Sequence, residues 1–337
     1  MNLKDIGEFG FIDRIRRGCL IRPAGIIRAI GDDAAVFRSE GQLLNLVTTD
    51  LLIERIHFLR EAVDPASLGH KALAVNLSDI AAMGGTARNA FVGLAVPPDV
   101  TLDFLDDLFG GMKHLAATHA VNILGGDTTG SDRDLVISLT VTGTVAESEV
   151  LFRDGARVGD VIFSSGCLGD SRAGLHLILN GIAADTPYLK TLLDAHLRPR
   201  PLVNEGRFLA TRGGVHAAVD VSDGLSSDLA HIVRLSRVGA RLYLDHLPLS
   251  PALQQFCCRQ GIDAAEYALT GGEDYTLLFT ADPSMADALA REYFAAFGQS
   301  LHRIGEITDS GRIEWIDGNG RSRLIVATGW NHFKKDL

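Results

Sequence analysis

Aspartate residues border or interrupt short apolar or glycine-containing runs at six separate places in this 337-residue chain. The six segments are G-D-D at 31–33, T-T-D at 48–50, N-L-S-D at 76–79, G-G-D-T-T at 125–129, D-V-S-D-G at 220–224 and G-G-E-D at 271–274. Burying an unpaired carboxylate is costly or forces it to take up a proton. Carboxylates gathered at one place also repel each other, so bound cations best explain such a site. The chain is thereby constrained to a fold that brings distant segments together around cations.

Each acidic segment by itself also has an ordinary explanation. Asp next to Gly is common in turns, where its side chain accepts local backbone hydrogen bonds. Six segments together favour metal and phosphate chemistry instead. Asp79 and Asp127 are the hardest to explain as turn residues, because both follow apolar runs. Oxygen-only ligands indicate Mg²⁺ or a similar hard cation, which typically acts beside phosphates.

Length and composition narrow the class of protein. A chain of 337 residues with 46% hydrophobic content is long enough for two packed domains. The net charge of −10 and the dispersed basic residues argue against nucleic acid as a partner. The four cysteines form no C-x-x-C pair, and neither an apolar leader nor a membrane-spanning run is present. We therefore expect a soluble cytoplasmic protein.

Strand-like and helix-like patterns alternate along the chain, which is typical of α/β or α+β architecture. The polar segment 147–159 separates two such alternations, so we expect domains at 1–148 and 149–337. The patterns predict helices at 67–83 and 101–118, with Ser67 and Thr101 as N-caps and Gly84 just past the first helix. That first helix is apolar nearly all round, which predicts that Asp79 lies on a buried face. A hairpin is expected to turn at 318–320.

Familiar nucleotide-binding loops are excluded, because the chain has no Gly-Lys dipeptide and no dinucleotide fingerprint. Three other residues each allow two interpretations. His57 alternates with apolar residues and is either a solvent-facing histidine on an edge strand or a functional group. Arg153, in the segment between the domains, is either a surface charge or a phosphate contact. Trp330 either covers the packing between domains or stacks on a flat ligand.

Together these segments resemble the thiamine-monophosphate kinases. This family is a branch of the superfamily that includes aminoimidazole ribonucleotide synthetase, selenophosphate synthetase and a hydrogenase-maturation factor. The matching segments occur in order over almost the whole chain, at 7–9, 30–34, 48–50 with 57–58, 71–84, 125–128, 196–201, 220–225 and 271–275. The run K-A-L-A-V-N-L-S-D-I-A-A-M-G at 71–84, together with G-G-E-D-Y at 271–275, is specific to this branch.

The resemblance implies a two-domain α/β (α+β) fold like that of aminoimidazole ribonucleotide synthetase, whose N-terminal domain pairs across a homodimer into a β-barrel-like interface. It implies that several Mg²⁺ ions are held by Asp33, Thr48, Thr49, Asp50, Asp79, Asp127, Asp220 and Asp223. It places ATP at Gly125, Gly126, Asp127, Arg153 and Ser222, and the thiamine phosphate at His57, Glu273 and Trp330. The chain departs from the family pattern around Arg153, where L-F-R-D-G replaces a threonine-arginine-serine-glycine run, and at Trp330, where relatives often carry another aromatic residue.

We therefore expect a kinase that depends on ATP and Mg²⁺ and converts thiamine monophosphate into thiamine diphosphate, the last step of thiamine diphosphate biosynthesis. The γ-phosphoryl group is expected to pass directly and in line, and no residue is expected to act as a covalent nucleophile. Donor and acceptor are both anionic, and a carboxylate-rich site with little lysine can bring them together only through metal ions.

Two rival functions remain open from the residues. One is ATP-driven activation of an amide or of selenide, and the other is a metal-loaded binding protein without turnover. Selenophosphate synthesis would call for a reactive Cys or selenocysteine and a Lys near the N-terminus, whereas Cys19 has no adjacent lysine. An assay of ATP consumption with thiamine monophosphate separates all three functions.

Overall fold

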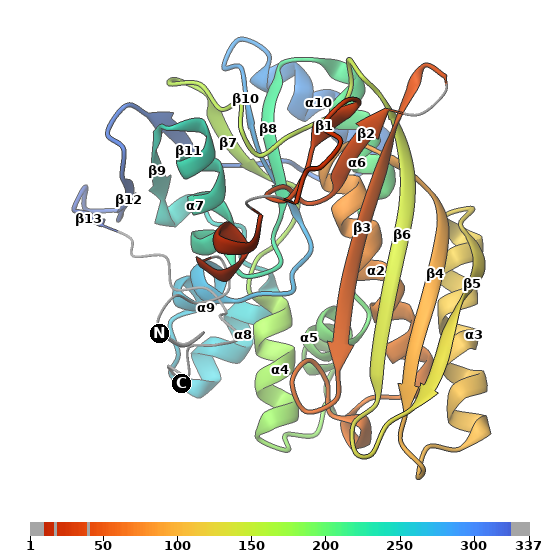
Figure 1. The fold of residues 1–337 in the computed structure, drawn as a ribbon. Coiled ribbons are helices and arrows are strands. Elements are labelled where there is room, and N and C mark those ends of the chain that lie inside the picture. Colours follow the sequence, from red (N-terminus) through yellow and green to blue (C-terminus); the bar gives the residue numbers. More distant parts are fainter. Residues whose placement is uncertain (1–9, 17–18, 39–40, 325–337) are drawn as a thin grey trace.

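The computed structural model describes residues 10–16, 19–38 and 41–324, and these form two β-sheets with flanking helices (Figure 1). The first half of the chain carries a six-stranded sheet and the second half a seven-stranded sheet. The expected α/β architecture with two domains is confirmed. Among the described residues, no helix has the length and apolar character needed to cross a membrane.

The six-stranded sheet has the order β1-β2-β3-β6-β4-β5. Its strands are β1 (Ile26–Arg28), β2 (Ala35–Arg38), β3 (Leu43–Ile53), β4 (Thr86–Val96), β5 (Asn122–Gly130) and β6 (Val136–Ala146). Neighbouring strands are antiparallel except β4 and β5, which run parallel. A parallel pair needs a crossover, and α3 (Leu102–Thr118) supplies it.

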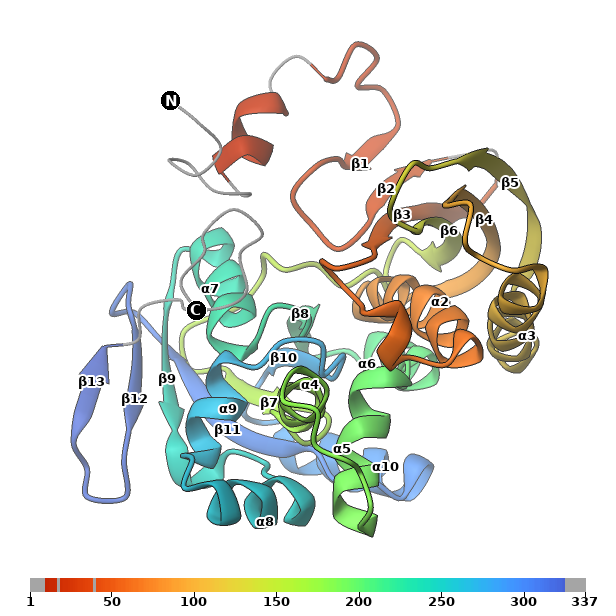
Figure 2. The same cartoon turned by 90° about the horizontal axis from the view of Figure 1, so that it is seen from below.

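Helices α2 (Pro65–Ala82) and α3 cover one face of this sheet (Figure 2). Burial along β6 alternates residue by residue, as expected for a strand with one face against a core. The opposite face is left uncovered by these helices. On it, Leu51 and Phe91 keep 52% and 40% of their surface exposed, so apolar area there is open to solvent in the single chain.

The ends of α2 and α3 can be compared with the capping residues predicted from the sequence. Asp64, not Ser67, caps α2, and its side chain accepts a hydrogen bond from the Ser67 amide at 2.8 Å. The prediction of Ser67 as N-cap was therefore wrong. Proline is favoured at the first helical position, so the helix begins at Pro65, before Ser67 in the chain. Thr101 does cap α3, and Gly84 follows α2 with a φ of +67°.

The seven-stranded sheet has the order β13-β12-β9-β11-β7-β10-β8. Its strands are β7 (Val161–Ser164), β8 (Val215–Asp220), β9 (Gly239–Tyr243), β10 (Leu277–Ala281), β11 (His302–Thr308), β12 (Ile313–Ile316) and β13 (Ser322–Leu324). Among the described strands of this sheet, only β9 and β12 pair in parallel. The predicted hairpin is confirmed, since β12 and β13 pair across the turn at 318–320.

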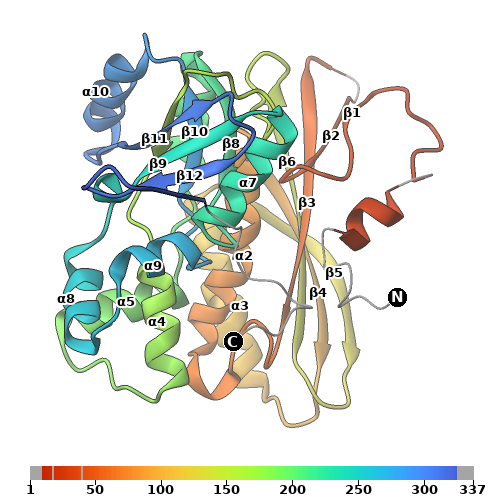
Figure 3. The ribbon, with the colours of Figure 1, turned by 90° about the vertical axis from the view of Figure 1, so that its left-hand side faces the viewer.

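Among the described residues, seven helices accompany the second sheet. They are α4 (Asp170–Leu179), α5 (Pro187–Leu197), α6 (Val203–Arg212), α7 (Leu225–Ser236), α8 (Pro251–Gln260), α9 (Ala264–Thr270) and α10 (Ala286–Phe297). The helices α4, α5, α8 and α9 gather at one end of this domain (Figure 3) and enclose a small apolar core around Phe256 and Leu192. Short 3-10 turns follow β3 (Arg60–Ala62) and β9 (Leu244–His246).

Helix α2 lies between the two sheets and belongs to the cores of both domains. The largest apolar cluster joins its Leu73 and Leu77 to Phe163 and Phe279 of the second sheet. Its contact with α6 is so close that a Cβ built on Gly206 would lie 2.1 Å from the Ala81 carbonyl oxygen. The relative position of the domains is therefore set by packing, and α2 carries its polar residues into the space between them.

The approach of α3 to α2 gives a matched test of this packing. A Cβ on Gly111 would lie 1.9 Å from the Ala66 carbonyl oxygen, whereas one on Gly110 would meet nothing within 4 Å. We expect Gly111→Ala to lower the free energy of unfolding by about 2 kcal/mol through overpacking. Gly110→Ala should raise it by about 0.5–1 kcal/mol through helix propensity. Denaturant unfolding measures both changes, and equal effects of the two substitutions would contradict the close approach.

Candidate metal and phosphate site

Three carboxylates from distant segments meet at the junction of the two domains. Asp33 precedes β2, Asp79 lies on α2, and Asp220 ends β8. One ligand oxygen from each lies within 4.8 Å of the others, and we call this group the acidic cluster. The strand β8 and the helix α2 contact each other directly, so packing between the domains assembles the cluster.

Neighbouring residues extend the acidic cluster in a way that strand alternation explains. Thr48 and Asp50 are two residues apart on β3, so both side chains point to the face of the sheet that α2 covers. The Thr48 hydroxyl donates a hydrogen bond to Asp79, and the Ser78 hydroxyl donates one to Asp220 at 2.6 Å. Ser78, from the N-L-S-D segment, is a contributor that the sequence interpretation missed.

Crowding and burial disturb the protonation of these carboxylates. Burial, with repulsion from Asp33, raises the pKa of Asp220 to about 8 and that of Asp50 to about 6. Burial and the charges of Asp50 and Asp220 hold the pKa of Asp79 well above its usual range. Ionised carboxylates so close together need a counter-charge.

Two buried oxygens of the acidic cluster lack a hydrogen-bond partner among the described residues, namely Asp33 Oδ2 and Asp220 Oδ1. Buried polar atoms are nearly always satisfied, so each orphan needs an explanation. A hard cation bound among the three carboxylates would satisfy both oxygens and offset the repulsion. The donor set therefore suits Mg²⁺.

Arginines border the acidic cluster on the side of β1. Arg153 pairs with Asp33, and its Nε lies 3.8 Å from Asp32 Oδ1. Its side chain is only 17% exposed, so the interpretation of Arg153 as a surface charge was wrong. Arg28 reaches both Asp32, at 3.3 Å, and Asp154, at 3.0 Å.

Asp32 is a member of this network that the sequence interpretation passed over. Its G-D-D segment carried the signal, although Asp33 alone was expected to be a ligand. Burial and the charge of Asp33 raise the pKa of Asp32 to about 7. Asp32 therefore adds to the excess of buried carboxylate beside Arg153.

Other predicted residues lie apart from the acidic cluster in the single chain. Gly125, Gly126 and Asp127 lie on the exposed edge strand β5, three strands away from β3. Neighbouring strands are about 4.8 Å apart, which gives a separation of roughly 14 Å. The Thr49 hydroxyl donates to the Leu139 carbonyl at 3.1 Å, on the opposite face of β3 from Thr48.

The loop after β8 holds two further predicted residues. The Ser222 carbonyl accepts a hydrogen bond from the Glu273 amide at 2.7 Å, so this loop is tied to the G-G-E-D segment. The Asp223 amide donates to Asp228 Oδ2 at 3.2 Å, and the Gly224 amide donates to the same oxygen at 3.0 Å. Asp228, on α7, thus fixes the loop. The sequence interpretation missed it because nothing local distinguishes it from a surface residue of a helix.

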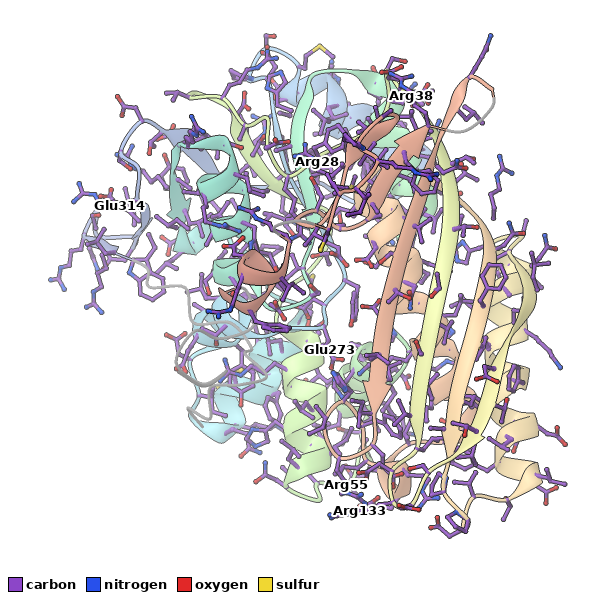
Figure 4. The ribbon with its side chains drawn as sticks, viewed as in Figure 1. Arg28, Arg38, Arg55, Arg133, Glu273 and Glu314 are labelled. Carbon is purple, nitrogen blue, oxygen red and sulfur yellow. The ribbon has the colours of Figure 1, made fainter. Side chains whose placement is uncertain are left out.

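The residues expected at the thiamine end are only partly described. Glu273 lies between the two domains, well below Arg28 in the view of Figure 4. Its carboxylate contacts Lys71 and His196, and a charge on His57 would stabilise its ionised form. His57 lies in the turn after β3 and not in an edge strand, and its Nδ1 accepts from the Ile53 amide at 3.0 Å. Trp330 lies outside the described residues.

Comparisons with known proteins show which family the chain belongs to. Residues 31–145 match the N-terminal domain, and residues 157–318 the C-terminal domain, of AIR synthase related proteins. The thiamine-monophosphate kinase of Aquifex aeolicus is 35% identical over 99% of this chain and 100% of its own. That of Escherichia coli K12 is 41% identical over 97% and 98% of the two chains. A solved structure described as "AaThiL complexed with AMPPCP and TMP" superimposes with a TM-score of 0.86 at 34% identity, covering 98% and 99% of the chains.

Fold and acidic cluster thus define a two-domain protein of the AIR synthase related class. Identity above 30% over nearly the full length of the relatives narrows the class further. The chain belongs to the thiamine-monophosphate kinase family.

Proton release gives a test of the metal site that does not depend on activity. Without metal, the raised pKa values keep Asp220 and its neighbours partly protonated at neutral pH. The folded chain then binds these protons more tightly than the unfolded chain. The contribution of these carboxyl groups to the free energy of unfolding therefore falls as the pH rises from about 4 to about 8. Mg²⁺ must displace the protons, so its affinity should fall at least about tenfold between pH 8 and pH 6.

Calorimetric titration of Mg²⁺ in buffers of different ionisation enthalpy counts the protons released. Asp220→Asn should reduce both the affinity and the proton release. Asp106→Asn, at an exposed position of α3, is the matched control and should change neither. An affinity independent of pH, with no proton release, would contradict Mg²⁺ binding at the acidic cluster.

Proposed function

We propose that the protein transfers the γ-phosphoryl group of ATP to the phosphate of thiamine monophosphate and so forms thiamine diphosphate, the last step of thiamine diphosphate biosynthesis. The observation that carries this proposal is the acidic cluster, in a chain related over nearly its full length to thiamine-monophosphate kinases. One of the solved relatives is described as a complex with AMPPCP and TMP, which supports the same pair of ligands here.

We propose that Asp33, Asp50, Asp79 and Asp220 hold Mg²⁺, with help from the Thr48 hydroxyl. When bound, Mg²⁺ would neutralise the charge of the donor and acceptor phosphates. The carboxylates would hold Mg²⁺ between the two domains. Helix α2 keeps Asp79 in place because it packs against both sheets. Roles of Thr49, Asp127 and Asp223 as further ligands stay predictions from the family resemblance.

For ATP we propose contacts from Gly125, Gly126, Asp127, Arg153 and Ser222. Arg153 is the best supported, since a guanidinium already beside the acidic cluster suits a phosphate bound to the same cations. His57, Glu273 and Trp330 are proposed for the thiamine end, and the first two are supported by their electrostatic interaction, since a charge on His57 lowers the pKa of Glu273.

The proposed function can be tested by the turnover of a variant that lacks one of the proposed Mg²⁺ ligands. Asp79→Asn should lower kcat with ATP and thiamine monophosphate by at least about a hundredfold, because a cation ligand is lost from the centre of the site. The fold should survive, since the amide keeps the size of the side chain. Asp106→Asn should retain normal turnover. ATP hydrolysis without thiamine diphosphate would instead favour another activating chemistry, and binding without ATP consumption would favour a binding protein.

Transfer is proposed to be direct, because the candidate carboxylates are claimed as metal ligands and are then poor nucleophiles. Positioning and charge neutralisation supply the acceleration, and the acceptor phosphate is already ionised at neutral pH. With ATP that is chiral at the γ-phosphorus, a single in-line step should invert the configuration. Net retention, or a competent phosphorylated protein, would exclude this mechanism.

We also propose a homodimer in which the N-terminal sheets pair into a barrel-like interface. The uncovered sheet face carries exposed Leu51 and Phe91, and the edge strand β5 carries Leu124 at 59% exposure. An unpaired edge and an apolar face are liabilities that a second copy would cover.

The domain boundary is proposed between residues 148 and 149, within the polar segment 147–159. The family matches, which end at 145 and resume at 157, support this boundary. The cytoplasmic location stays a prediction.

The dimer can be tested by a substitution on the uncovered face of the N-terminal sheet. Phe91→Asp places a charge on the uncovered face of β4 and should convert the dimer into a monomer at micromolar concentration. Leu102→Asp, at the start of α3 and 78% exposed, is the control and should leave the dimer intact. Sedimentation velocity distinguishes the two states, and a monomeric wild-type protein with full activity would refute the proposal.

A further inference from the structure

Glu273 lies in a loop whose backbone is held in an unusual conformation. Glu273 and Tyr275 have φ values of +62° and +50°, in the left-handed region that residues other than glycine rarely occupy. The loop is fastened by hydrogen bonds from the Glu273 amide to the Ser222 carbonyl, at 2.7 Å, and from the Tyr275 amide to the Val221 carbonyl, at 2.8 Å. Strain of this kind persists only where the surrounding structure enforces it, and it gathers at functional sites.

The side chain of Glu273 is held from the other domain. Lys71 extends from α2, and its Nζ lies 2.9 Å from Glu273 Oε1 and 3.0 Å from Oε2. The lysine side chain is 3% exposed, whereas the glutamate side chain keeps 27% of its surface open. A lysine so deeply buried is costly unless it is paired. Lys71 is therefore committed to Glu273, while one side of the carboxylate stays accessible to a ligand.

A histidine on α5 completes the contacts. His196 Nδ1 lies 3.2 Å from Glu273 Oε2 and 3.0 Å from the Ser171 hydroxyl. Burial and the charge of Lys71 lower the pKa of His196 to about 4, so this ring is neutral at pH 7. Burial opposes ionisation of Glu273, but the charge and hydrogen bond of Lys71, together with the influence of His196 and His57, outweigh it, and the pKa of Glu273 is lowered. The carboxylate is thus an ionised group that can only accept hydrogen bonds, with its charge largely offset by Lys71.

The position of Lys71 on α2 gives the distance between the Lys71–Glu273 pair and the acidic cluster. Lys71 and Asp79 are eight residues apart on α2, which corresponds to about 12 Å along the helix axis. An extended thiamine monophosphate, with its phosphate at the metals, can bridge such a span to the aminopyrimidine ring. A carboxylate already neutralised by lysine is better suited to accept from a neutral N–H donor than to pair with a second cation.

We propose that Lys71 is a positioning residue for the acceptor substrate: from the N-terminal domain it orients Glu273 to accept a hydrogen bond from the exocyclic amino group of the pyrimidine ring. This inference rests on the proposed function, in which thiamine monophosphate is the acceptor. It explains why a lysine is buried at the junction of the domains beside a strained, partly open carboxylate.

The test compares thiamine monophosphate with oxythiamine monophosphate, in which oxygen replaces the exocyclic amino group. Wild-type enzyme should prefer the amino compound in kcat/KM. Lys71→Met should raise KM for thiamine monophosphate roughly tenfold, as expected for losing a hydrogen bond to a charged group, and raise KM for the oxygen analogue far less. Its KM for ATP should stay within about twofold, because the metal site is separate. Lys71→Arg, which keeps the charge and two donors, should restore part of the discrimination.

Arg207→Met is the matched control, because Arg207 also joins the domains: it donates a hydrogen bond to the Gly84 carbonyl at 2.6 Å, and it pairs with Glu149 of its own domain at 2.8 Å. That contact lies at the far end of α2, so its loss should lower the melting temperature and leave both KM values and the discrimination unchanged. If Lys71→Met behaves in the same way, Lys71 only clamps the domains and the inference is overturned.

Glu273→Gln, of the same size, provides the second variant should Lys71→Met fail to fold. It should also lose discrimination between the two acceptors, and full retention would overturn the inference. Wild-type enzyme that forms no thiamine diphosphate would overturn the proposed function itself, a result that variants of active enzyme cannot produce.

Discussion

Mutual repulsion among Asp33, Asp79 and Asp220 is the constraint around which this structure is organised. Each carboxylate comes from a separate segment, and two of them expose less than a tenth of their surface. Packing of α2 against both sheets supplies the stabilisation that forces them together, because its apolar surface is buried on nearly every side. The site and the interface between the domains are therefore one feature: what packs the domains also concentrates the charge that a cation would bind.

The two ends of the junction between the domains differ in their charged groups. Toward β1, Arg153 and Arg28 face an excess of carboxylates at Asp32, Asp33 and Asp154. Farther along α2, Lys71 faces the single carboxylate Glu273. The first arrangement suits phosphates held through cations, and the second suits an uncharged donor group. A substrate with a phosphate at one end and an aminopyrimidine at the other matches this polarity.

Local signals predicted the elements that carry the acidic cluster well. The all-round apolar pattern of 67–83 indicated a helix buried on nearly every side, and the N-L-S-D segment placed Asp79 on it. Where prediction failed, a competing local or distant interaction decided the result. Pro65 moved the start of α2 to Asp64, and Arg153, which has no local partner, is buried because Asp32 and Asp33 approach from another segment. Asp228 and Lys71 carry no local mark of function, since their partners lie in other elements.

The sequence alone determined the type of elements, the two-domain architecture, the oxygen-only set of candidate ligands and the family, because these depend on periodicity, residue type and motif order. Only the tertiary structure decided which carboxylates share a site. It joins Asp33, Asp79 and Asp220, turns Thr48 and Thr49 to opposite faces of β3, and leaves Asp127 on an edge strand of the single chain. Proximity between distant segments depends on how helices and sheets pack against one another, and no local pattern records that distance.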